Sequence, residues 1–139
     1  RPGETVWWPF ECAGVYEYPM TVFDDGTGKL RHVQLTACSF AEIEKLLWTA
    51  LEAGHQSFVM LSHSFELLNG GSRDRSDPVT INRFRKFCAF MEKNRDSFRV
   101  RGFQGMQPEV AVQPPPLLRS PIWRTGMRMA EQVYRRRYR

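Results

Sequence analysis

The clearest alternation of hydrophobic and polar positions lies between residues 39 and 54. Ser39 and Glu42 have the spacing of a capping box, in which the serine oxygen accepts a free N–H and the glutamate reaches back to the start of the helix. Gly54 follows as a typical C-terminal stop. The apolar positions that recur at helical spacing are Ile43, Leu46, Leu47, Ala50 and Leu51. The pattern predicts a helix with one face in the core.

Shorter apolar runs predict strands on both sides of this helix. Residues 57–62 contain the continuous apolar run Phe58-Val59-Met60-Leu61, which is typical of a buried strand. Residues 15–23 and 30–35 are rich in β-formers and flank a turn cluster at 24–28, so we expect a hairpin. Residues 98–103 alternate apolar side chains with arginine, which predicts a strand with one wet face.

The C-terminal half should contain two more helices. Asp77 and Pro78 are typical of an N-cap and a first helical position. The expected buried side of the helix that begins there consists of Val79, Phe84, Phe87, Cys88 and Met91. A Pro-rich linker is expected over 104–120, followed by a basic amphipathic helix over 121–139. On that last helix, Ile122, Met129, Ala130 and Val133 should share one side and the arginines the other. Helices alternating with strands predict an α/β fold.

The run 57–62 ends abruptly in polar residues. Ser62, His63, Ser64 and Glu66 follow Leu61 within five positions. In sheets fed by helices, ligands sit at the carboxyl ends of strands. A histidine there can act as an acid, a base or a metal ligand, although a histidine that caps a strand and bonds to backbone is the alternative. Glu66 could orient His63 or bind substrate, or it could be a surface or capping carboxylate.

The net charge is distributed unevenly along the chain. Residues 1–116 carry 13 basic and 14 acidic side chains, a net charge of −1. Residues 117–139 carry seven arginines against one glutamate, a net charge of +6. The basic character therefore belongs to the C-terminal segment, which could touch phosphates or an anionic membrane surface, or could be a solvated helix end. We expect no nucleic-acid partner.

Composition excludes several classes. With 139 residues and 42% hydrophobic content, the chain is long enough for one packed domain. No apolar run approaches the roughly 20 residues of a membrane span. Three cysteines without a C-x-x-C predict neither a disulfide framework nor a thiolate zinc site. The first residue is Arg1 and no signal pattern follows, so we expect missing upstream sequence and a cytoplasmic, reducing location.

Several segments, in order, resemble polysaccharide deacetylase-like proteins (carbohydrate esterase family four). Residues 14–21, Gly-Val-Tyr-Glu-Tyr-Pro-Met-Thr, are similar to a family strand, and Ser39-Phe40-Ala41-Glu42 resembles the helix start that follows it. Leu61-Ser62-His63 is similar to the family's last motif, a leucine and a histidine one residue apart, and Ser64-Phe65-Glu66-Leu67 resembles its extension in one branch. The likeness covers about residues 14–103.

This resemblance implies that residues 1–103 are the C-terminal portion of a deformed (β/α) barrel, and that the parent protein is a hydrolase removing N-acetyl groups from a carbohydrate. In the family a divalent metal, often zinc, polarises the acetyl carbonyl. By the same resemblance, His63 would protonate the leaving amine, and Leu61 would line the acetyl pocket with Ser62 and Glu66 beside it. An incomplete barrel would leave open strand edges through which chains could associate.

The chain departs from the family at the metal site. The family's H-[S/T]-x-x-H pair is missing, because His32, His55 and His63 are too far apart in sequence. The run 21–26, Thr-Val-Phe-Asp-Asp-Gly, imitates the family's aspartate motif, but we interpret it as hairpin-turn chemistry. This stretch alone should therefore be inactive. The alternative is a non-catalytic carbohydrate-binding or protein-interaction module, in which Trp7 and Trp8 could stack on sugar rings.

Overall fold

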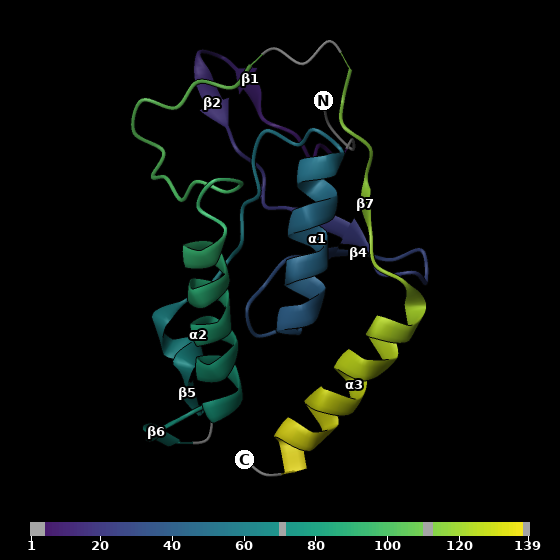
Figure 1. Ribbon diagram of the computed structural model, residues 1–139, viewed down its shortest axis with the longest axis vertical. Coiled ribbons are helices and arrows are strands. Elements are labelled where there is room, and N and C mark those ends of the chain that lie inside the picture. Colours follow the sequence, from purple (N-terminus) through teal and green to yellow (C-terminus); the bar gives the residue numbers. More distant parts are fainter. Residues whose placement is uncertain (1–4, 70–71, 110–112, 138–139) are drawn as a thin grey trace.

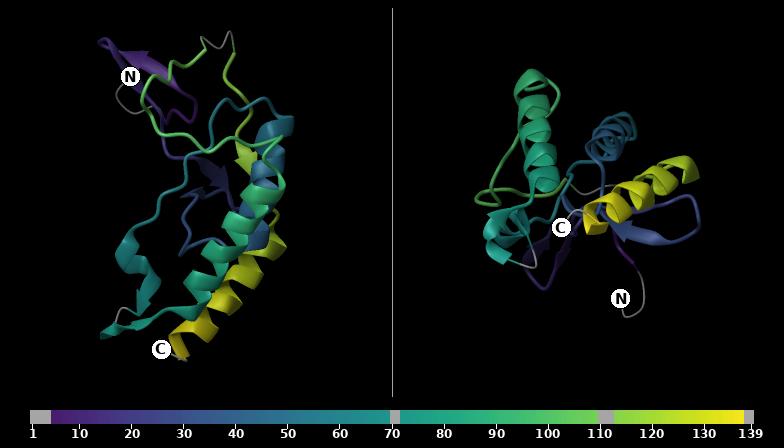
Figure 2. Two further views of the ribbon diagram at one scale, coloured as in Figure 1. Left: turned by 60° about the vertical axis from the view of Figure 1, so that its left-hand side comes forward. Right: turned by 90° about the horizontal axis from the view of Figure 1, so that it is seen from below.

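The computed structural model describes residues 5–69, 72–109 and 113–137. Within them the protein is mixed α/β, with helices on one side of the molecule and most of the strands on the other (Figures 1 and 2). The strands are β1 (Phe10–Cys12), β2 (Val15–Glu17), β3 (Val22–Asp24), β4 (Leu30–His32), β5 (Leu68–Asn69), β6 (Ser72–Ser76) and β7 (Leu118–Arg119). The helices are α1 (Phe40–Glu52), α2 (Pro78–Lys93) and α3 (Ile122–Arg137), with a 3₁₀ turn η1 (Ser64–Leu67).

The central sheet has the order β4-β3-β7. β3 pairs antiparallel with β4 through the predicted hairpin, and parallel with β7, where Phe23 lies opposite Leu118. The chain stays extended after β4, and Gln34 forms a parallel bridge with Leu61. Val33, α1 and Leu61 thus form a strand–helix–strand unit in which the two extended segments run the same way.

The core lies between α1 and this sheet. The apolar face of α1 packs on Phe23, Val33 and Leu118, all of which are buried. Trp48 and Phe90 meet edge-on at 5.9 Å between ring centroids, and Phe98 closes the same aromatic cluster. The predicted helix and four of its five core positions are confirmed; Leu51 is exposed.

The predicted N-cap residues of α1 and α2 are confirmed, but one hydrogen bond of the predicted capping box is not. Ser39 Oγ accepts the N–H of Glu42, at 3.2 Å, as a capping serine should. The reciprocal half of the predicted capping box is wrong, because the Glu42 carboxylate instead accepts from Ser120 Oγ at 2.7 Å. In α2, Asp77 caps Val79 and Thr80 as expected.

The buried side of α2 is partly rotated from the prediction. Thr80, Arg83 and Phe90 are its fully buried residues. Of the predicted face, Phe87 and Met91 pack against the core and Val79 is half-buried, whereas Phe84 and Cys88 are exposed. Arg83 explains the rotation: its guanidinium donates to the carbonyl oxygens of Leu35 and Thr36 at 3.1 and 3.0 Å. A charged side chain that satisfies buried carbonyls takes a position that sequence pattern assigns to an apolar residue.

Three predicted strands differ from the structure. Residues 15–23 divide into β2 and β3 around Pro19, because proline cannot donate to a ladder. Residues 57–62 are extended but are held by single contacts, such as Thr21 N–H to Val59 O at 2.9 Å, so only Leu61 forms a bridge. Residues 98–103 form no strand; Phe98 packs on the core while Val100 and Phe103 are exposed. Between η1 and α2 the structure has the short strands β5 and β6, with residues 70–71 outside the described part.

The predicted linker contains part of the core. Leu118 and Ser120, within 104–120, are buried, and β7 completes the central sheet. Across the described residues the strands form small open sheets and no closed barrel. In the same residues no helix is both long enough and apolar enough to cross a membrane.

The C-terminal helix is present, but its orientation contradicts the simple expectation for an amphipathic helix. Ile122, Met129 and Val133, the predicted apolar side, are exposed. Thr125 and Arg128 are buried instead. α3 therefore contacts the body through its polar face.

Candidate functional site

The predicted site residues lie together in the short segment after the extended strand. Leu61 is half-buried at its parallel bridge with Gln34, and Ser62 and His63 follow as exposed residues. The His63 imidazole stacks on the ring of Phe65, with 5.0 Å between centroids and an interplanar angle of 8°. The histidine is thus held at the carboxyl end of the strand and remains open to solvent.

Glu66 fixes the shape of this segment. Its Oε2 accepts the backbone N–H of His63 at 3.1 Å and faces the Ser62 hydroxyl at 3.5 Å. Its Oε1 faces the Thr36 hydroxyl at 3.4 Å, across from the neighbouring extended segment. These contacts are those of a capping carboxylate: Glu66, at the third position of η1, accepts the backbone N–H of the N-cap residue His63. Glu66 therefore orients the His63 segment through its backbone and not through a contact with the imidazole ring.

The described residues do not fit a metal centre. Nowhere in that part of the chain do three or more His, Cys, Asp or Glu side chains come together in a way that could hold an ion. The buried carboxylates of Asp25 and Glu42 share one partner, the guanidinium of Arg128. Both carboxylates are therefore occupied by a cation that the protein supplies itself.

This buried ionic cluster is the main feature that sequence reasoning missed. Arg128 lies 3.5 Å from Asp25 Oδ2 and 3.2 Å from Glu42 Oε2, and the three side chains are at most 2% exposed. Thr125 Oγ1 accepts from Arg128 at 3.1 Å and donates to the Asp25 carbonyl oxygen at 2.7 Å. Buried charges are tolerated when they are paired and hydrogen-bonded, and here every member has several partners.

The turn between β3 and β4 prepares Asp25 for this pairing. Asp25 Oδ1 accepts from the hydroxyl of Thr27 at 2.5 Å, and Arg31 Nε donates to Oδ2 at 2.6 Å. These two contacts hold the pKa of the Asp25 carboxyl well below its usual range, despite burial. Gly26 has φ +82°, and a Cβ there would lie 2.7 Å from the Ile122 backbone nitrogen, so the turn can approach the start of α3 only with glycine.

A second arginine joins the same elements from the other side. Besides its bonds to Leu35 and Thr36, Arg83 lies 2.7 Å from Glu131 Oε2 of α3. The polar stripe of α3, with Thr125, Arg128 and Glu131 three positions apart, is the sequence signal that could have pointed to these contacts. Nothing in the spacing says which partners it would find.

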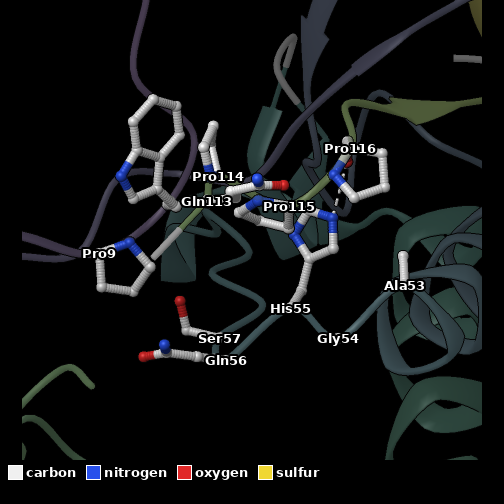
Figure 3. A pocket seen from close by; sticks show the side chains of 11 residues that line it. Pro9, Ala53, Gly54, His55, Gln56, Ser57, Gln113, Pro114, Pro115 and Pro116 are labelled. Carbon is white, nitrogen blue, oxygen red and sulfur yellow. Dashed lines mark hydrogen bonds between the residues drawn. The ribbon is translucent and has the colours of Figure 1, made fainter. Parts of the chain in front are cut away.

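A cavity of about 260 Å³ lies elsewhere, at the C-terminal end of α1. Trp8, His55 and Gln56 line it together with residues 113–116 (Figure 3). The ring Nε2 of His55 lies 2.9 Å from the Pro116 carbonyl oxygen, which requires an Nε2–H donor and leaves Nδ1 as an acceptor. Burial lowers the pKa of His55, which favours this neutral form.

The cavity and the His63 segment are separate features. His55 and Ser57 lie at the beginning of the extended segment and His63 at its end, roughly 20 Å apart at the rise of an extended chain. None of the residues lining the cavity belongs to the predicted site. No protein-family model, curated protein or solved structure matches this chain, so its function has to be inferred from its residues and their geometry.

Proposed function

We propose that this chain is part of a polysaccharide deacetylase-like hydrolase and contributes the proton-donating histidine, His63. The observation that carries the proposal is the parallel bridge between Gln34 and Leu61, with α1 as the connection. Parallel strands joined by a helix are the repeating unit of (β/α) barrels, in which catalytic residues lie at the carboxyl ends of strands. His63 has that position, and a partial barrel is the architecture we propose for residues 1–103.

The proposed reaction is hydrolysis of an N-acetyl group on a carbohydrate. Water adds to the acetyl carbonyl carbon, the C–N bond breaks with its electron pair moving to nitrogen, and nitrogen takes a proton from the His63 imidazolium. The products are acetate and a free amine. An exposed, oriented imidazole suits proton transfer of this kind. Glu66 is a positioning residue, because it holds the backbone of His63.

The chain by itself should release no acetate, since the family's paired histidines are missing from its sequence and the described residues do not fit a metal. The divalent metal that the resemblance implies, zinc or another, would therefore need residues other than those described. Cytoplasmic location remains part of this proposal.

The test is an NMR titration of the full chain with a pentamer of N-acetylglucosamine, in which the backbone amide shifts report binding. The pentamer of glucosamine, which lacks the acetyl groups, is the control. The N-acetylated oligomer alone should shift the amides of Leu61, Ser62, His63 and Glu66. His63→Gln should weaken binding severalfold, whereas His32→Gln, a change at another exposed histidine, should have no effect. Absence of shifts at this segment overturns the proposal.

A non-catalytic carbohydrate-binding module is the second candidate, and the cavity beside Trp8 is the observation that favours it. An aromatic ring with a neutral histidine acceptor and an amide side chain is a typical sugar subsite. In the same titration, this candidate predicts shifts around Trp8 and His55 for both oligomers. Trp8→Ala would then abolish binding while His63→Gln leaves it unchanged.

A further inference from the structure

The exposed face of α3 has a composition unlike that of an ordinary solvated helix. The exposed apolar residues along it are Ile122, Trp123, Met127, Met129, Val133 and Tyr134. They follow one another at helical spacing over the whole element, with Gly126 and Ala130 between them. Figure 1 shows α3 at the edge of the molecule, and the exposed fractions of these residues show that this face is open to solvent. A continuous apolar stripe of this length marks an interaction surface.

The inward face of α3 explains why the apolar face is outside. Arg128 is committed to Asp25 and Glu42, and Glu131 to Arg83. Rotating the helix to bury its apolar side would leave these buried charges without partners, which is strongly destabilising. The outward orientation is therefore built into the fold.

The charge of residues 117–139 indicates which kind of partner the exposed face of α3 can bind. Glu131 is the one acid in residues 117–139, and it is used in the ion pair with Arg83 at 2.7 Å. The remaining charges of the segment are arginines, of which Arg119 and Arg137 are exposed and Arg124 lies over the Trp123 ring at 4.8 Å. The partner must therefore be anionic and must also accept an apolar stripe.

We propose that the outer face of α3 binds the surface of an anionic lipid bilayer. A basic helix with a strong apolar face and low mean hydropathy lies in the interface plane, with apolar side chains below the headgroups and arginines among the phosphates. Trp123 and Tyr134, near opposite ends of the stripe, are the aromatic types enriched at that level. A nucleic acid would use the arginines but not the isoleucine, methionines and valine.

The experiment is vesicle flotation of the full chain with phosphatidylcholine alone and with phosphatidylcholine plus phosphatidylserine. Partitioning should be at least about tenfold stronger with phosphatidylserine, and it should fall at high salt, because residues 117–139 carry a net charge of +6. Met127→Glu should reduce it by about tenfold or more, since it places an acid in the stripe without touching the core. Circular dichroism and the thermal midpoint should stay unchanged in this variant.

Val100→Glu is the matched control, because Val100 is 79% exposed and Met127 is 62% exposed, and Val100 is not on α3. It should leave vesicle binding intact. Equal loss in both variants, or no binding to phosphatidylserine vesicles, overturns the proposal. A concentration-dependent dimer that Met127→Glu abolishes, in a protein that does not bind vesicles, overturns it in favour of a second copy of the chain as the partner.

Discussion

α1 and α3 are both amphipathic helices, yet they contact the body through opposite kinds of surface. α1 buries Ile43, Leu46 and Leu47 against the sheet and keeps its charged residues outside, with Glu42 as the exception. α3 buries Thr125 and Arg128 and exposes its apolar residues. Glu42 and Asp25 make the difference, because two buried carboxylates demand a cation, and Arg128 provides it.

The comparison shows that a helix takes the orientation with the lowest total cost, which is not always the orientation that buries most apolar area. Burying a large apolar side chain gains about 1.5–3 kcal/mol. Leaving a buried charge without its partner costs about 3–5 kcal/mol. Each buried ion pair that would be broken therefore offsets the burial of one to three large apolar side chains, and α3 keeps the orientation in which Asp25 and Glu42 are paired with Arg128.

Removing Arg128 should have the largest effect. Arg128→Met leaves Asp25 and Glu42 without their shared cation, so we expect a loss of about 3–5 kcal/mol in the free energy of unfolding, measured by urea denaturation. Adding Glu42→Gln to this variant should recover part of the loss. Arg137→Met, at an exposed arginine of the same helix, should change stability by less than about 0.5 kcal/mol. Similar losses for both arginine variants would contradict the ionic account of α3.

Truncation in the apolar region should cost somewhat less. Leu46→Ala removes a buried side chain from the face of α1, and we expect a loss of about 3 kcal/mol from transfer and cavity terms. Leu51→Ala, on the exposed part of the same helix, should cost clearly less. The contrast would fail if the two substitutions gave equal shifts of the urea midpoint.

Lowering the pH should weaken the ionic cluster around Asp25 but not the apolar packing of α1. The Asp25 pKa is lowered in the folded state, so its contribution to stability is complete above the unfolded pKa and is lost as pH falls through the folded value. The free energy of unfolding should therefore decrease between about pH 4 and pH 2, and Asp25→Asn should make this decrease shallower. Leu46→Ala should lower stability at every pH without changing the slope. A parallel pH profile for Asp25→Asn would refute the role given to this carboxyl.

Loss of a cap should have the smallest effect. Ser39→Ala removes the acceptor for the Glu42 N–H and should cost about 1 kcal/mol. Because Glu42 does not complete the capping box, Glu42→Gln should leave the cap intact and act through Arg128 and Ser120 instead. In the Arg128→Met background the same substitution should instead recover part of the lost stability, and a double-mutant cycle in urea would measure this change of sign.

The proposed site was found from the sequence in part. The strand-end position of Leu61, Ser62 and His63 follows from an apolar run that ends in polar residues, and the structure does bring Glu66 to this segment. The Thr36 contact could not be predicted, because it depends on which extended segment lies beside residue 61. The cavity beside Trp8 depends in the same way on how distant loops meet.

Local sequence signals are enough to predict four features of the fold: the serine-capped helix α1, the Asp-Pro start of α2, the β3–β4 hairpin and the existence of α3. These follow from propensity, capping and turn chemistry within a few residues. Three other features depend on long-range contacts and are seen only in the folded chain: the parallel bridge of Leu61, the place of Leu118 in the sheet and the face that α3 buries. Each of these depends on pairings between residues tens of positions apart, and for α3 the deciding quantity is whether Asp25 and Glu42 find a cation in the core.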